Sequence, residues 1–152
     1  MKYSIGSGNI KEEGFISVDI SDKCGADIVA DVREPWTWAL EPIEELKSYN
    51  LLEHLSVEER ISVMNEAHDR MKPGGKFFVR VPLLKLDEAH FSGAFSDPTH
   101  KTFWTIETVD YFNKNHARGR VFGRDYGIKL WEVLKNEEAG EKFLDIILQK
   151  PL

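Results

Sequence analysis

The chain has 152 residues, of which 41% are hydrophobic and 30% charged, and its formal net charge is −6. This length and composition predict one globular domain over residues 1–152. The acidic balance argues against a protein whose main partner is nucleic acid. No apolar run is long enough to cross a membrane and no signal-peptide pattern is evident, so no membrane association is expected. The single cysteine, Cys24, excludes an internal disulfide and favours a reducing, cytoplasmic location.

The N-terminal residues predict a glycine turn between two strands. Lys2–Ile5 is expected to form the first strand, Gly6–Gly8 the turn, and Phe15–Ile20 the second strand. Glycine allows the backbone to turn sharply and to approach a ligand closely. Asp19, at the carboxyl end of the second strand, could accept hydrogen bonds from both hydroxyls of a ribose. This arrangement is typical of a nucleotide-binding α/β sheet, although such turns alone are common.

The connection between these two strands is unusually short. Only the nine residues Asn9–Ser17 follow the glycine turn, whereas a parallel crossover with a helix needs a dozen or more. The first helix should therefore be absent or reduced to one turn. Its N-terminus would then be unavailable to a pyrophosphate, which disfavours NAD and leaves a nicotinamide-dependent oxidoreductase as a remote alternative.

The next segments complete the parallel part of the predicted sheet. Ala26–Val32 is expected to be a third strand, with Asp31 near its end. Two prolines and two tryptophans predict a loop or a single turn over Arg33–Pro42. Glu44–Tyr49 is expected to be a fourth strand in spite of its charges.

A helix and a central strand are predicted next. Ser56 and Glu59 have the spacing of a capping box at a helix start. Pro73–Gly75 should end this helix, and the β-branched and aromatic run Phe77–Pro82 should form a central strand. The inward face of the helix is predicted to carry Ile61, Met64, Ala67 and Met71.

The C-terminal third predicts one more helix and a hairpin. After an irregular stretch over Leu83–Phe103, Thr105 should cap a helix that runs to Lys114. Asn113–Arg124 is interpreted as a basic, glycine-containing loop. The inward residues of the helix are predicted to be Ile106, Val109 and Phe112.

Two strands are expected at the end of the chain, Ile128–Leu134 and Phe143–Leu148. The polar connector Asn136–Gly140 favours an antiparallel hairpin between them. The whole order therefore predicts a mostly parallel sheet with a C-terminal antiparallel hairpin.

Five short segments, taken in order, resemble class I S-adenosylmethionine-dependent methyltransferases, and most closely small members with a shortened first crossover. The resemblance implies an α/β, Rossmann-like class I methyltransferase fold. It also implies S-adenosylmethionine as cofactor, S-adenosylhomocysteine as product, and O- or N-methylation of a small-molecule or sugar acceptor. A catalytically inactive binding or regulatory module of the same fold is the alternative, and no oligomeric state is predicted. The segments are Ile5–Gly8, Gly14–Asp19, Asp27–Asp31, Leu51–Leu55 and Met71–Lys76.

The resemblance also implies where the cofactor binds. The glycine turn would pass under the methionine moiety and the ribose, and Asp19 would hold the ribose hydroxyls. Asp31 would accept from the adenine amino group, with Val32 beside the ring. Asn50 and Leu51 would lie near the sulfonium. The predicted cofactor-binding residues are Gly6, Ser7, Gly8, Asp19, Ile20, Asp31, Val32, Asn50 and Leu51.

Two departures from the family pattern affect the site. Ser4 stands where many members have an acid or Asn, which bears on how the amino group of the cofactor is held. Some ubiquinone-pathway and RNA-end methyltransferases bind a divalent metal through E-x-x-E-H, but here Asn50 replaces the first carboxylate. Glu53 and His54, together with His100, could still hold an ion. The favoured interpretation is a helix-start pair that satisfies local backbone groups, so no metal is predicted.

The loop after the central strand supplies the predicted catalytic residues. His100 could act as general base, since its ordinary pKa of about 6.5 suits proton removal near neutrality, and Asp97 could orient it. The alternative is a loop pinned by Asp97 capping and by aromatic packing. His90 and His68 are given no function, and His68 is expected to face solvent.

Two further groups of side chains have both a functional and a structural interpretation. Six aromatic residues could wall a pocket for a planar acceptor, although core or lid packing is expected for at least half of them. A basic run could meet a phosphate on a substrate, although a solvated loop is the favoured interpretation. These groups are Trp36, Trp38, Phe91, Phe95, Phe103 and Trp104, and Lys114, His116, Arg118, Arg120 and Arg124.

Overall fold

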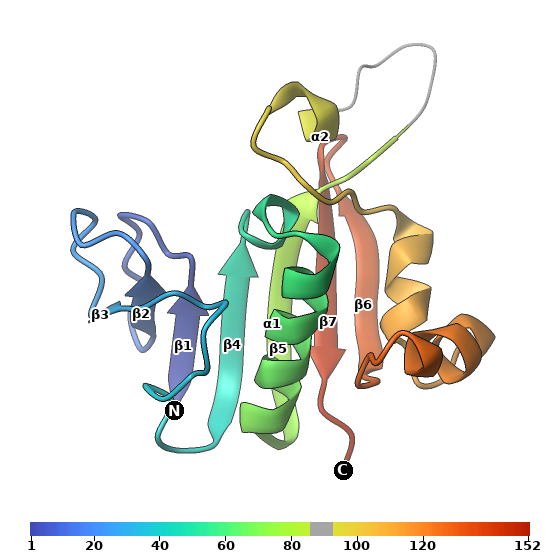
Figure 1. Cartoon of the computed structure of the whole chain (residues 1–152), viewed down its shortest axis with the longest axis horizontal. Coiled ribbons are helices and arrows are strands. Elements are labelled where there is room, and N and C mark those ends of the chain that lie inside the picture. Colours follow the sequence, from blue (N-terminus) through green and yellow to red (C-terminus); the bar gives the residue numbers. More distant parts are fainter. Residues whose placement is uncertain (86–92) are drawn as a thin grey trace.

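The computed structural model describes residues 1–85 and 93–152, and its centre is a seven-stranded sheet with the order β3-β2-β1-β4-β5-β7-β6 (Figure 1). The first five strands run parallel, β7 is antiparallel to β5, and β6 is antiparallel to β7. This confirms the predicted mostly parallel sheet with a terminal hairpin. The strands are β1 (Lys2–Ile5), β2 (Ile16–Asp19), β3 (Ile28–Val29), β4 (Ile43–Tyr49), β5 (Met71–Pro82), β6 (Glu132–Ala139) and β7 (Phe143–Gln149).

Five helical segments accompany the sheet in residues 1–85 and 93–152, and α1, with 14 residues, is the longest of them. In the part of the chain that the structure describes, no helix is long and apolar enough to cross a membrane. The segments are η1 (Leu52–His54), α1 (Val57–Arg70), α2 (Gly93–Ser96), η2 (Ile106–Phe112) and η3 (Gly119–Gly123).

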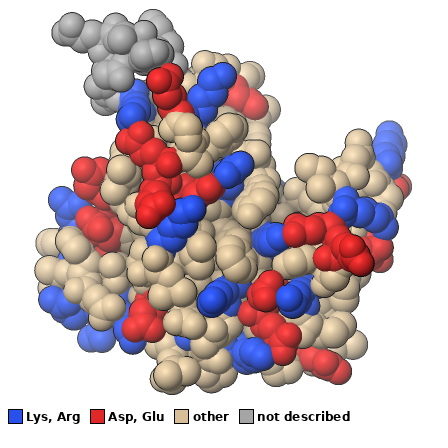
Figure 2. Space-filling model, turned by 180° about the vertical axis from the view of Figure 1, so that it is seen from behind, with Lys and Arg blue, Asp and Glu red and all other residues tan. Residues whose placement is uncertain are grey.

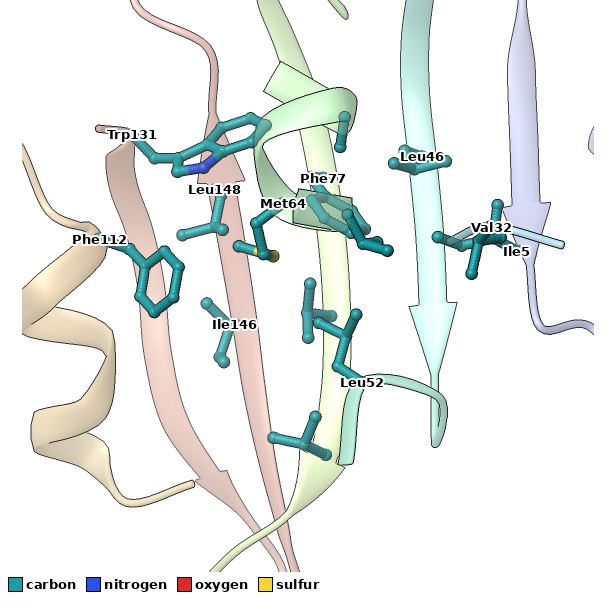
Figure 3. Packing of buried hydrophobic residues seen from close by; sticks show 14 of the residues in the cluster. Ile5, Val32, Leu46, Leu52, Met64, Phe77, Phe112, Trp131, Ile146 and Leu148 are labelled. Atoms are coloured by element: carbon teal, nitrogen blue, oxygen red, sulfur yellow. The ribbon is translucent and has the colours of Figure 1, made fainter. Parts of the chain in front are cut away.

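The hydrophobic core lies between α1 and one face of the sheet. Figure 3 shows Met64 of α1 over the sheet beside Phe77 of β5 and Leu148 of β7. These side chains are at most 1% exposed. Phe77 and Leu148 occupy paired positions on neighbouring strands, so alternate residues of each strand point into the same layer.

The opposite face of the sheet is polar and open to solvent. Lys2 pairs with Glu45 across β1 and β4, and Arg80 pairs with Asp145 across β5 and β7. Figure 2, which shows the molecule from behind, has acidic and basic side chains interspersed on this side. A strand with one solvent-facing side accommodates charges at alternate positions, which explains how β4 forms from a charged sequence.

The link from β1 to β2 contains no helix, as the short spacing predicts. Two turns lie between the strands, at residues 7–10 and 12–15, closed by the bonds from the Ile10 N–H to the Ser7 carbonyl and from the Phe15 N–H to the Glu12 carbonyl. The chain then pairs directly alongside β1, with Tyr3 opposite Ile16.

Helix α1 begins as its sequence predicts. The Ser56 hydroxyl accepts from the Glu59 N–H, and the Glu59 carboxylate accepts from the Ser56 N–H, which completes the capping box. The helix ends at Arg70, three residues before the predicted stop, because Met71 is already extended and pairs with Ile43. Pro73–Gly75 therefore lies in an irregular start of β5, not at the helix end.

Two predictions for residues 105–124 are wrong in detail. Thr105 caps η2 as expected, and Val109 is buried, but Ile106 is 40% exposed. Asn113–Arg124 is not a loop, because residues 117–125 form a helix that includes η3. Gly119 and Gly123 allow this helix to pack closely on the preceding segment, since a Cβ on either would come within 2.2 Å of a backbone oxygen there.

The hairpin is also shifted along the chain. β6 starts at Glu132 and includes the polar residues predicted to be its connector, so the turn falls at residues 140–142. β6 is an edge strand, and an edge strand tolerates charges that a central strand excludes.

Candidate functional site

The glycine turn and the end of β2 are held together by Asp19. One carboxylate oxygen of Asp19 accepts from the Gly8 N–H at 2.8 Å, and the other accepts from the Ser21 N–H at 2.9 Å. Ser7 also contacts this strand, since its N–H donates to the Val18 carbonyl. Asp19 therefore lies at the turn, as the sequence predicts, and its remaining lone pairs are available to a ligand.

A cleft of about 200 Å³ opens beside this turn at the carboxyl ends of β1, β2 and β4. Six of the nine predicted cofactor residues line it. Ser7, Gly8 and Asn50 are outside the lining, although Gly8 is bonded to Asp19. The lining residues are Gly6, Asp19, Ile20, Ala30, Asp31, Val32, Arg33, Leu51, His54 and Leu55.

Gly6 and Leu51 both line the cleft and lie close together. Gly6 has φ +61°, a conformation that favours glycine. A Cβ at this position would lie 3.0 Å from the side chain of Leu51. Asn50, the only residue other than glycine with positive φ in the described part of the chain, makes the bend that brings Leu51 over the turn.

The third strand contributes a carboxylate that already has a partner. Arg33 binds Asp31 through Nε and Nη2, with the shortest bond at 2.6 Å, and its N–H also donates to Asp31. Hydrogen bonds from Arg33 lower the pKa of Asp31. A ligand at this end of the cleft would therefore meet an ion pair and not a free carboxylate, which the sequence did not predict.

The chain resembles known proteins in fold and not in sequence. No protein-family model matches it, and no curated protein is similar to it in sequence. Among solved structures, an O-methyltransferase family protein from Burkholderia thailandensis aligns with 99% of the chain, at a TM-score of 0.63 and 14% identity. A SAM-dependent methyltransferase from Archaeoglobus fulgidus aligns with 98%, at a TM-score of 0.60 and 18% identity.

A third solved structure was determined with ligands. It is the 1,6-didemethyltoxoflavin-N1-methyltransferase of Burkholderia thailandensis with S-adenosylhomocysteine, and it aligns with 99% of the chain at a TM-score of 0.64 and 13% identity. The chain has the class I methyltransferase fold. It spans half the length of the first of these proteins, 85% of the second and 71% of the third.

In this methyltransferase fold, a second cluster of polar side chains adjoins the cleft at η1. The Lys101 and Thr102 N–H groups both donate to the Glu53 carbonyl, at 2.7 and 3.1 Å. The Thr102 hydroxyl donates to the Leu52 carbonyl. These bonds fasten the loop after α2 onto η1 and bring the rings of His54 and His100 to 4.9 Å.

The hydrogen bonds of the two histidines assign their tautomers. Nδ1 of His100 lies 2.7 Å from the Ala94 carbonyl, which can only accept, so Nδ1 carries the proton. Thr99 donates its hydroxyl proton to Asp97, and the Thr99 oxygen therefore accepts from Nδ1 of His54 at 3.0 Å. In the neutral form of each ring, this tautomer leaves a free lone pair on Nε2.

Asp97 lies beside His100, but the contact is long. Asp97 Oδ2 is 3.6 Å from His100 Nε2, while Oδ1 accepts from the N–H and the hydroxyl of Thr99. Asp97 therefore pins the loop, as the structural interpretation expects. The His100 side chain is only 8% exposed and does not line the cleft.

Glu53 departs from its predicted surroundings. Its exposed fraction is 2%, and neither carboxylate oxygen has a hydrogen-bond partner among the residues the structure describes. Burial raises its pKa. The interaction of the carboxylate with its own backbone N–H opposes this rise, in keeping with the predicted local pairing, whereas His54 bonds the side chain of Thr99 and not a backbone group.

Three members of the predicted aromatic wall, Trp36, Trp38 and Trp104, pack in or against the core, whereas Phe95 and Phe103 are exposed. Trp36 and Trp104 are at most 1% exposed, and Trp36 stacks on Trp38. Phe95 packs on Phe103 at 4.6 Å, while Phe91 lies outside the described residues, as does His90. His68, expected to face solvent, is half-buried against the Trp131 ring.

A hollow larger than the cleft, of about 670 Å³, lies between α1 and η2. It contains none of the predicted cofactor or catalytic residues. Phe103 is the one member of the predicted aromatic wall that lines it. Arg60, which also lines it, stacks on the Trp104 ring at 4.8 Å.

The basic run is largely paired within the protein. Arg118 and His116 both lie near Asp110, at 3.1 and 3.7 Å, and Lys114 bonds Glu132. Arg120 donates to the Asn115 carbonyl. These partners favour the structural interpretation over a phosphate site.

Proposed function

We propose that this protein is an S-adenosylmethionine-dependent methyltransferase. The observation that carries the proposal is the 2.8 Å bond between the Gly8 N–H and Asp19 at the edge of a cleft. It holds a glycine turn and a strand-end carboxylate together where an open α/β sheet binds its ligand. The fold supports the same function, since solved structures that share it include methyltransferases and one of them binds S-adenosylhomocysteine.

In this proposal the cleft holds the adenosine and the glycine turn passes under the methionine moiety. Asp19 accepts from the ribose hydroxyls, with Ile20 beside them, and Asp31 accepts from the adenine amino group next to Val32. Arg33 already supplies three donors to this carboxylate, so the adenine amino group would share Asp31 with Arg33. Leu51 lies where the sulfonium would meet the acceptor.

The acceptor in this proposal is a small molecule. An acidic net charge and interspersed charges on the face seen in Figure 2 favour it over nucleic acid. One of the proteins with this fold methylates such a compound at nitrogen, by its name. Because the sulfonium is already an activated donor, the protein mainly aligns donor and acceptor for direct displacement.

The predicted base, His100, stays a hypothesis within this proposal. Its Nε2 has the free lone pair that a base needs, and Asp97 lies near it. An acceptor must reach that nitrogen to lose its proton there, and the side chain is 8% exposed. The proposed function therefore rests on the cofactor-binding residues and not on His100 as a base.

The test combines binding with turnover. We expect S-adenosylhomocysteine to bind in calorimetry with one site per chain, and S-adenosylmethionine carrying a labelled methyl group to transfer label to a member of a panel of small hydroxyl and amine compounds. Binding without transfer to any member would favour the inactive binding module. Absence of binding would contradict the proposal itself.

A further inference from the structure

We propose that Glu53, His54 and His100 bind one divalent transition-metal ion. One ligand atom from each of the three side chains lies within 4.8 Å of the others. Glu53 and His54 come from η1, and His100 is brought to them by the loop that bonds the Glu53 carbonyl. The site uses none of the nine residues proposed to hold the cofactor. It excludes His100 as the general base, because the metal would occupy the Nε2 lone pair.

The burial of the Glu53 carboxylate without hydrogen-bond partners indicates that a cation binds there. It is 98% buried, and both its oxygens lack a hydrogen-bond partner among the described residues. A buried, unpaired carboxylate costs several kcal/mol unless a counter-charge or donors satisfy it. When both histidines are neutral, their Nε2 atoms cannot donate to this carboxylate, and an ion shared by all three groups satisfies every one of them.

The histidines already have the orientation of metal ligands. A histidine that binds a metal through one nitrogen commonly donates its other N–H to a carbonyl or another oxygen. His100 does so to the Ala94 carbonyl and His54 to Thr99, which is itself fixed by Asp97. Both rings are therefore held in the tautomer that presents Nε2.

The distances permit coordination after a small contraction. Two ligands about 2.1 Å from one ion can be no more than about 4.2 Å apart. A tetrahedral ion holds its ligand atoms about 3.4 Å apart. His54 Nε2 is 3.9 Å from Glu53 Oε1, and the widest separation in the set is within 4.8 Å, so shifts of about 1 Å in the side chains bring them to coordinating distances. Asp97, with its carboxylate 3.6 Å from His100 Nε2, adds negative charge beside the ion.

The ligand set selects the kind of metal. Two imidazoles and one carboxylate suit Zn²⁺, Fe²⁺ or Co²⁺ better than Mg²⁺ or Ca²⁺, which prefer oxygen ligands throughout. Three protein ligands also leave coordination positions open. His54 lines the cleft, so the ion would lie at its edge. If methyl transfer takes place there, which rests on the proposed function, an acceptor oxygen could occupy an open position.

Cobalt is the probe that tests this site. We expect the chelator-treated full chain, titrated with Co²⁺, to develop a saturable visible absorption band at one ion per chain. Glu53→Gln and His100→Gln should each weaken Co²⁺ binding at least tenfold, because each removes one of three ligands. His116→Gln, at the pair with Asp110 on η2, is the matched control and should bind as the wild type does.

A second measurement avoids substitutions that could disturb folding. In the wild-type chain, Zn²⁺ should shift the imidazole nitrogen resonances of His54 and His100 and leave those of His68 and His116 unchanged. Absence of saturable binding, equal binding by all variants, or shifts at other histidines would overturn the proposal. S-adenosylhomocysteine binding, measured on the same samples, separates this failure from failure of the proposed function.

Discussion

At the scale of single residues, Asp19 has two functions that one substitution can separate. Its carboxylate fixes the glycine turn through Gly8 and Ser21, and in the proposed function it also holds the ribose. The two N–H groups are at a half-exposed position, where water can replace a lost acceptor. In the proposed complex, water cannot replace Asp19 in the same way as the acceptor for the ribose hydroxyls.

We therefore expect Asp19→Ala to weaken S-adenosylhomocysteine binding much more than it weakens the fold. Hydrogen bonds to a charged group contribute about 1.5–3 kcal/mol each, so affinity should fall at least tenfold, while the free energy of unfolding should fall by about 1 kcal/mol. Calorimetry and urea unfolding measure the two effects. Asp22→Ala, at an exposed neighbouring position, is the control; unchanged affinity in Asp19→Ala would refute the ribose contact.

The sequence predicted the position of Asp19 better than the surroundings of Glu53, and the reason is physical. Asp19 follows a strand, and the ends of parallel strands meet at one edge of a sheet. The surroundings of Glu53 depend on Lys101 and Thr102, which lie 48 and 49 positions later and reach it through backbone bonds. Local sequence patterns contain no information about such a contact.

At the scale of elements, η3 is held against the end of η2 by two glycines. A Cβ on Gly119 would lie 2.1 Å from the Asn113 carbonyl oxygen, and one on Gly123 would lie 2.2 Å from the Tyr111 carbonyl oxygen. Neither backbone oxygen can move without disturbing the segment to which it belongs. Close approach, and not conformational freedom, explains glycine at both positions.

We expect Gly123→Ala to lower the free energy of unfolding by about 1–3 kcal/mol, the usual range for overpacking, and Gly119→Ala to do the same. Gly93→Ala is the matched control, because a Cβ there meets nothing within 4 Å and should change stability by under about 0.5 kcal/mol. Urea unfolding followed by circular dichroism measures all three variants. Wild-type stability in both Gly119→Ala and Gly123→Ala would contradict the packing.

Elements with a local signal were predicted well, and those without one were not. The capping box at Ser56 located the start of α1, and the spacing after Gly8 correctly predicted a missing helix. η3 was missed because its glycines and arginines resemble a loop when the η2 surface is unknown. β6 was displaced because an edge strand has no need of the apolar residues by which strands are recognised.

At the scale of the whole molecule, the polar sheet face makes stability depend on pH. Arg80 of β5 binds Asp145 of β7 through two bonds of 2.6 and 2.8 Å, and these bonds lower the pKa of Asp145. A carboxylate whose pKa is lowered by folding stabilises the protein above its unfolded pKa of about 4. That contribution is lost as the pH falls through the lower, folded pKa.

We therefore expect Asp145→Asn to be less stable than the wild type at pH 7, by about 1 kcal/mol given partial screening by solvent. The difference should shrink as the pH falls below about 4, since the wild type then loses the same interaction. Urea unfolding from pH 3 to pH 7 tests this, with Asp125→Asn at an exposed position as control. A difference that grows toward low pH would contradict the assigned direction.

The whole account depends on the cleft beside Asp19 binding an adenosine. The most direct measurement is thermal unfolding of the full chain with S-adenosylhomocysteine and, separately, with NAD. A ligand present at 100 times its dissociation constant stabilises a protein by about 2.7 kcal/mol, so S-adenosylhomocysteine should raise the unfolding midpoint by several degrees and NAD should leave it unchanged. An increase with NAD alone, or with neither compound, would contradict the account.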